Sequence, residues 1–114
     1  MDKETQIRSL KAELEVLKKH QETSRKQGEN FEKKIINLSN KIELKENLLA
    51  TQEDYQDKMK LKLDIYNLSK KRSDMEIALN YTEIIQTGIS RKRHNRIQML
   101  YNLEYNSVQR KRRR

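Results

Sequence analysis

The sequence predicts an all-α protein made of long coiled-coil helices, elongated in form, with a short amphipathic helix at the C-terminal end. Three observations predict this class: few apolar residues, no proline, and an apolar heptad repeat. Of 114 residues, 33% are hydrophobic and 38% are charged, against roughly 45–50% and roughly 25% in typical soluble domains. A coiled coil tolerates this composition because each helix buries only a narrow stripe.

Helix breakers are almost absent. The chain has no proline and two glycines, Gly28 and Gly88. Proline costs about 3 kcal/mol inside a helix, so its absence favours long helices. Low hydrophobicity with a net charge of +9 is also typical of disorder. The periodicity of the apolar residues therefore has to decide between the two.

The heptad repeat is the strongest signal. With Ile7 at position a and Leu10 at position d, eight of twelve a sites and six of twelve d sites are apolar, in one register without a shift. Such a repeat predicts helices that associate along an apolar seam. The predicted oligomer interface, with a second copy or another helical chain, consists of Ile7, Leu10, Leu14, Leu17, Phe31, Ile35, Leu38, Ile42, Leu49, Met59, Leu63, Tyr66, Ile77 and Ile84.

Residues 1–27 are predicted to form an N-terminal coiled-coil helix. Its seam ends in three poor core residues, Gln21, Ser24 and Gly28. Gly28 costs about 1 kcal/mol in a helix relative to alanine. Residues 28–30 are therefore predicted to be a weak point or hinge, where the first helix either folds back on the next or continues into it.

Residues 31–87 are predicted to form the main coiled-coil helix. Lys45 and Lys70 fall in its seam, where they either set register and partner choice or direct their long stems out to solvent. In its second half a further apolar stripe accompanies the seam, and it consists of Leu61, Ile65, Leu68, Met75 and Leu79. Two stripes on one helix suit a helix with more than one neighbour.

Residues 88–114 are predicted to form a basic C-terminal helix or tail. Gly88 lies where a C-cap glycine would end the main helix, and Ser90 could cap a third helix. The apolar residues that follow, such as Leu100 and Leu103, cluster without a clean repeat. We therefore expect this segment to contribute attachment or localisation and little to coiled-coil stability.

Positive charge is concentrated in this last segment. Residues 1–60 carry thirteen Lys and Arg residues against twelve Asp and Glu, whereas residues 61–114 carry thirteen against five. The predicted attachment or import signal consists of Arg91, Lys92, Arg93, Arg96, Arg110, Lys111, Arg112, Arg113 and Arg114. Such a cluster suits nuclear import or nucleic-acid phosphates, an acidic protein or membrane surface, or a solubilising end.

The sequence contains no recognisable catalytic motif. It has no cysteine, and His20 and His94 lack partners at metal-ligand spacing, so both are predicted to be exposed. We expect no enzyme activity, no cofactor, no metal and no small-molecule substrate. Without an apolar leader or a run of roughly 18 apolar residues, we expect an intracellular protein of the nucleus or the cytoskeleton-associated cytoplasm, with no transmembrane segment and no secretion.

One short stretch carries a resemblance. The residues Glu53-Asp54-Tyr55-Gln56-Asp57-Lys58-Met59, followed by Tyr66-Asn67, resemble a segment of the coiled-coil domain-containing protein 122 family. The resemblance covers about fifteen residues and implies only a coiled-coil protein.

Two functions fit these features. The first is a structural or scaffold coiled-coil protein that self-associates or pairs with another helical chain, with the basic tail for localisation or attachment. The alternative is a nucleic-acid-binding accessory protein that dimerises through its coiled coil.

Overall fold

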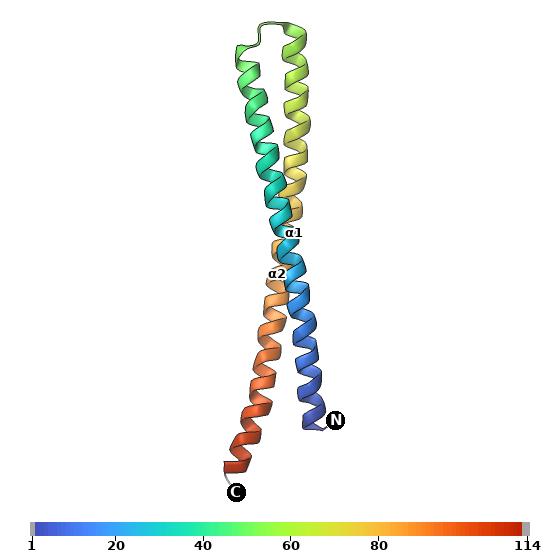
Figure 1. The fold of residues 1–114 in the computed structure, drawn as a ribbon, viewed down its shortest axis with the longest axis vertical. Helices are drawn as coiled ribbons and strands as arrows, with labels where there is room; N and C mark the ends of the chain where they lie inside the picture. The colour runs from blue at the N-terminus through green and yellow to red at the C-terminus, as the bar shows by residue number, and fades with distance from the viewer. Residues whose placement is uncertain (1, 113–114) are drawn as a thin grey trace. The chain divides into compact units, whose positions relative to one another are not determined.

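The protein is described by a computed structural model of residues 2–112, with side chains described for residues 2–105. It consists of two α-helices, α1 (Lys3–Thr51) and α2 (Tyr55–Arg112), with no strand among those residues (Figure 1). The predicted all-α class with long coiled-coil helices is confirmed. The helices contribute to two compact units: the turn unit is Lys26–Glu83, and the terminal unit combines Met1–Arg25 with Ile84–Arg114.

The chain reverses direction between the helices at Gln52, Glu53 and Asp54. The Oε1 atom of Gln52 accepts hydrogen bonds from the backbone N–H groups of Glu53 (3.1 Å) and Asp54 (3.2 Å). Asp54 caps α2, because its carboxylate accepts from Asp57 N–H at 3.1 Å and its carbonyl accepts from Lys58 N–H at 2.9 Å. These bonds satisfy donors that a helix start leaves unpaired, so the turn forms without glycine or proline.

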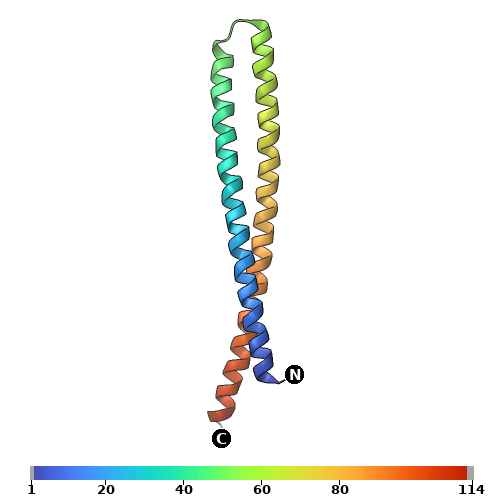
Figure 2. The same cartoon turned by 45° about the vertical axis from the view of Figure 1, so that its right-hand side comes forward.

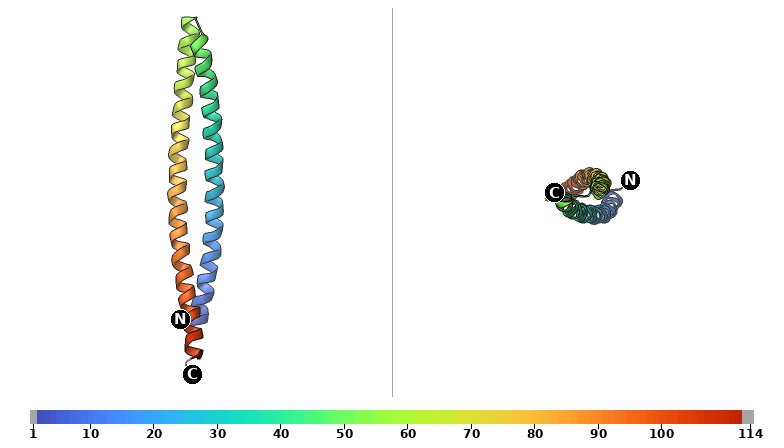
Figure 3. Two further views of the ribbon diagram at one scale, coloured as in Figure 1. Left: turned by 90° about the vertical axis from the view of Figure 1, so that its left-hand side faces the viewer. Right: turned by 90° about the horizontal axis from the view of Figure 1, so that it is seen from above.

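Each unit is an antiparallel helix pair. In the turn unit, the second half of α1 lies beside the first half of α2 in both views (Figures 1 and 2). In the terminal unit, the start of α1 lies beside the later part of α2 (blue and orange in Figure 3). The seam that each pair buries is therefore formed within one chain.

The register predicted for α1 is confirmed. Every a and d residue from Ile7 to Gln52 is buried or half-buried, including Gln21, Ser24 and Gly28. Leu10 and Ile42 are the most enclosed apolar side chains, at 6% and 4% exposed. The 3.5-residue period alone is therefore enough to identify the buried face of this helix.

The face of α2 that packs on α1 is not the one in the predicted register. The residues assigned to its seam are exposed, with exposed fractions of 49% for Met59, 59% for Leu63, 64% for Tyr66, 55% for Ile77 and 67% for Ile84. Apart from Asp64, Ser69 and Ala78, the buried and half-buried side chains described for α2 recur at spacings of three and four in another phase. They are Lys58, Leu61, Ile65, Leu68, Arg72, Met75, Leu79, Thr82, Gln86, Ile89, Arg93, Arg96, Leu100 and Leu103.

The physical reason for the change of register is the reversal at residues 52–54. These three residues are not helical, so the helical phase of α1 does not carry over into α2. The apolar stripe that the sequence shows beside the predicted seam, from Leu61 to Leu79, is the stripe that packs on α1.

The predicted helix boundaries also differ from those observed. α1 continues through Gly28, so residues 28–30 do not interrupt it, and α2 continues through Gly88 instead of ending there. No described glycine has a positive φ. A helical glycine costs about 1 kcal/mol relative to alanine, which is less than the loss of backbone hydrogen bonds and seam packing that a break would cause.

Replacing Gly88 by alanine tests this continuity. A Cβ at Gly88 would meet no heavy atom within 4 Å, so Gly88→Ala should stabilise the protein by up to about 1 kcal/mol and raise the melting temperature in circular dichroism. Ala12→Gly, at an exposed position of α1, is the matched control and should lower it by a similar amount. A drop in stability for Gly88→Ala would instead indicate a left-handed cap glycine that ends the helix.

The start of α1 predicts a pH effect. The Asp2 carboxylate accepts a hydrogen bond from Thr5 N–H at 2.7 Å, and this bond holds the pKa of Asp2 below its ordinary value of 3.8. A carboxylate with a lowered pKa stabilises the fold above its unfolded pKa, and this contribution is lost as the pH falls through the folded pKa.

The Asp2→Asn variant caps the helix without titrating. Its stability relative to the unchanged protein should therefore improve as the pH falls between about 5 and 2, as measured by urea unfolding at each pH. A stability difference that does not vary over this range would mean that the Asp2 cap does not form in solution.

Candidate interaction surfaces

The predicted oligomer-interface residues of α1 pack against the chain's own α2. Nine of the fourteen predicted residues lie on α1, and all nine are buried or half-buried in the seam. The surface expected to bind another chain is therefore covered within the hairpin. The remaining five residues lie on α2 and are exposed.

Four of those exposed residues form a stripe along α2 within the turn unit. The outer stripe comprises Met59, Leu63, Tyr66, Lys70, Ser73 and Ile77, at alternating spacings of four and three. A helix turns about 100° per residue, so the centre of this stripe lies about 150° around α2 from the centre of the seam. α2 thus has apolar side chains on two nearly opposite faces.

The outward side of α1 in the same unit has fewer apolar residues. Ile36, Leu44 and Leu48 are 58%, 64% and 58% exposed. Leu44 and Leu48 lie one helical turn apart. Ile36 lies about two turns before Leu44 and at another position of the heptad. Scattered exposed apolar residues of this kind are normal on soluble proteins, so only the outer stripe of α2 has the repeat that is typical of a helix-binding face.

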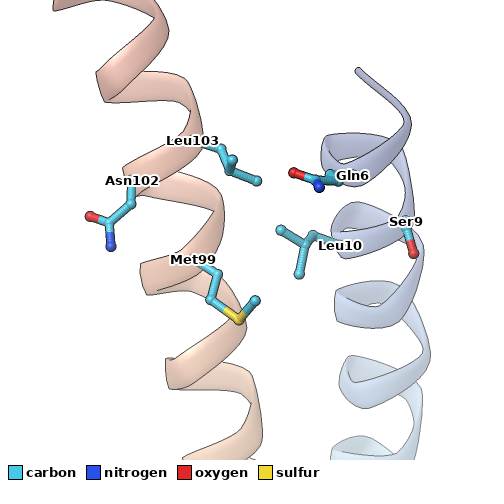
Figure 4. Close-up of a pocket in the computed structure, with 6 residues that line it drawn as sticks. All are labelled: Gln6, Ser9, Leu10, Met99, Asn102 and Leu103. Carbon is cyan, nitrogen blue, oxygen red and sulfur yellow. The ribbon is translucent and has the colours of Figure 1, made fainter. Parts of the chain in front are cut away.

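Two grooves lie between the helices of the terminal unit. The first, of about 460 Å³, has Leu10, Met99 and Leu103 on the facing sides of the two helices (Figure 4). The second is lined by Val16 and Leu17, with the polar residues Glu13, His20, Lys92 and Arg96. Leu10 is only 6% exposed, because the packing of α1 and α2 against each other already covers most of its side chain.

The structure divides the predicted basic residues into two groups. Arg91 and Lys92 are exposed, whereas Arg93 and Arg96 are half-buried in the seam. The side chains of residues 110–114 lie outside those that the structure describes. Leu100 and Leu103 are also half-buried at seam positions, so part of the segment from residue 91 onward packs on α1.

Both half-buried arginines are held by α1. Arg93 Nη1 donates to Gln21 Oε1 at 3.0 Å, and Gln21 Nε2 donates to Ser90 Oγ at 3.1 Å. Arg96 Nε lies 2.6 Å from Glu13 Oε2. Sequence reasoning assigned these arginines to attachment, although their spacing from Thr82 onward, alternating four and three, is the signal that places them in the seam.

The lysine predicted in the seam of α1 makes an ion pair at its edge. Lys45 is half-buried and its Nζ lies 3.2 Å from Asp64 Oδ2, with the two side chains 34% and 38% exposed. The stem thus packs in the seam while the charge reaches solvent, as for a snorkelling lysine. Lys70, the other predicted seam lysine, is exposed on the outer stripe.

Other chemistry is not assembled in the part of the chain that the structure describes. His20 and His94 are both exposed, as predicted. No cluster of three His, Cys, Asp or Glu side chains suited to a metal ion is found among the described residues. Within the same residues, neither helix has a stretch long and apolar enough to cross a membrane.

Comparisons with known proteins find no matching family model, curated protein or solved structure. The resemblance of residues 53–67 to the coiled-coil domain-containing protein 122 family therefore rests on those residues alone.

The polar layer formed by Gln21 and Arg93 leads to a prediction for stability. Replacing partly buried polar pairs by well-packed apolar residues is often stabilising, whereas removing one partner leaves the other unpaired. The double variant Gln21→Leu/Arg93→Leu should therefore unfold in urea with a free energy about 1 kcal/mol above that of the unchanged protein. It should also be more stable than either single variant. A double variant less stable than the unchanged protein would show that the polar pair contributes net stability.

Proposed function

We propose that the protein is a structural or scaffold helical protein, in which the hairpin presents a second apolar face to a second copy or to another helical chain. The observation that carries this proposal is the outer stripe of α2, whose exposed Leu63, Tyr66 and Ile77 repeat at heptad spacing on the side away from the seam. A helix with apolar residues on two faces is typical of one with a neighbour on each.

The energetics support association of this kind. Burial of apolar surface contributes about 25 cal/mol per Å². The four apolar residues of the outer stripe are between 49% and 64% exposed, so each still has much of its side-chain surface to remove from water. The seam of the hairpin has already used the other apolar face of α2, which leaves the outer stripe for intermolecular contact.

The basic end of α2 fits attachment or localisation in this proposal. Arg91 and Lys92 project into solvent, where clustered positive charge attracts polyanions or acidic surfaces. The alternative function, as a nucleic-acid-binding accessory protein, draws support from the exposed Tyr101 and Tyr105. Their ring centroids lie 5.6 Å apart in a stacked arrangement, so the two rings already make part of the contact that a base would make.

A salt titration separates the two functions. Nucleic-acid binding through phosphates weakens steeply as salt rises. Association of helices through an apolar face does not weaken in this way, because salt screens charges and has little effect on the burial of apolar surface. The scaffold proposal therefore expects association that persists at high salt.

Charges placed in the outer stripe should abolish association. Leu63→Asp/Ile77→Asp should lose self-association in sedimentation velocity and lose capture of helical partners by cross-linking in cell extract. Ile36→Asp/Leu44→Asp is the matched control, because these α1 residues are similarly exposed in the same unit but lie off the stripe. Equal behaviour of the two variants, with helicity unchanged in circular dichroism, would overturn the proposal.

A further inference from the structure

The charges that flank the outer stripe indicate which partner it fits. Lys62 and Glu76 each immediately precede a stripe residue, so they share one flank of the stripe. Lys60 and Asp74 each immediately follow a stripe residue, so they share the other flank. All four side chains are exposed. Each flank thus carries a lysine near the start of the stripe and a carboxylate near its end.

We infer that the outer stripe of α2 pairs antiparallel with the same stripe of a second copy of this chain, an inference that rests on the proposed function. In antiparallel helix pairs, a positions face d positions and like flanks face each other. The stripe then pairs with itself about a two-fold axis, with Met59 opposite Ile77, Leu63 opposite Ser73 and Tyr66 opposite Lys70. A two-fold interface of this kind is self-complementary by construction.

This pairing brings opposite charges together on both flanks. Lys62 of one copy lies opposite Glu76 of the other, and Lys60 lies opposite Asp74. The two-fold axis repeats each pair, so four acid–base pairs border the apolar contact. Glu76 is also 4.0 Å from Arg72 of its own helix, yet its side chain is 55% exposed, so its carboxylate is accessible to the second copy.

The parallel arrangement is disfavoured by the same residues. In a parallel pair the stripe residues face their own copies, which places Lys70 against Lys70. The flanking charges then meet residues five positions further along the other helix, so Lys62 faces Asn67 and Glu76 faces Tyr81. The antiparallel arrangement instead sets Lys70 over the ring of Tyr66, where its stem packs and its ammonium group is attracted to the ring.

Charge reversal tests the pairing. The acidic variant Lys60→Glu/Lys62→Glu and the basic variant Asp74→Lys/Glu76→Lys should each self-associate about tenfold more weakly or worse, because all four pairs become repulsive. An equimolar mixture of the two should associate about as tightly as the unchanged protein, because every pair is again attractive. Lys33→Glu/Lys34→Glu, at exposed positions of α1 in the same unit, makes the same charge change away from the stripe and should have little effect.

Cross-linking tests the orientation. The chain has no cysteine, so thiols can be introduced singly. Chains with Leu63→Cys mixed with chains with Ser73→Cys should join through a short bis-maleimide cross-linker, whereas either variant alone should not. Efficient cross-linking of Leu63→Cys to itself, or no cross-linking in the mixture, would overturn the inference.

The oligomeric state separates this inference from the proposed function. If the full chain sediments as a monomer at every concentration but captures another helical chain in a stripe-dependent way, the second copy is the wrong partner and the scaffold function stands. If the unchanged chain captures nothing and stays monomeric, both fail. A dimer that dissociates with either charge variant and re-forms in their mixture supports both.

Discussion

The packing of α1 against α2 is the interaction on which the rest of the structure depends, and the reversal at Gln52–Asp54 makes both helices of each pair come from one chain. The seam is thin: Leu10 and Ile42 are the buried apolar residues among those described, and none of these side chains falls below 2% exposed. Stability is therefore distributed along the helices, with each seam residue contributing a part of its burial energy. Both helices therefore continue through their glycines, because every helical turn adds packing between α1 and α2.

The seam between the two helices is built from different residues in the two units. In the turn unit the seam is mainly apolar, with residues such as Ile35 and Ile42 on α1 and Leu68 and Met75 on α2. In the terminal unit, apolar residues of α1 share the seam with arginines of α2 at two heptad positions. An arginine can serve there because its stem covers apolar surface while its guanidinium group reaches a polar partner at the edge. Gln21 and Glu13 supply those partners.

This use of arginine changes the interpretation of the basic segment. The sequence alone does not say which side of a helix each basic side chain is on, because that depends on the phase of the helix relative to its partner. Arg93 and Arg96 face α1, while Arg91 and Lys92, one or two residues away, face solvent. A charge cluster that looks uniform in the sequence thus contains both structural and accessible members, and only the accessible ones can attract a polyanion or an acidic surface.

The sequence by itself determined the all-α class and the buried face of α1, because a heptad repeat is a property of a single helix and survives without knowledge of the partner. It also indicated two stripes on α2, but it could not say which one is buried. That choice depends on the phase with which α2 leaves the turn at Gln52–Asp54, and the turn has no glycine or proline to reveal it. Only the tertiary structure decided that Leu61 and Leu68 face α1 while Leu63 and Ile77 face solvent, because burial is a property of a helix pair and not of either helix alone.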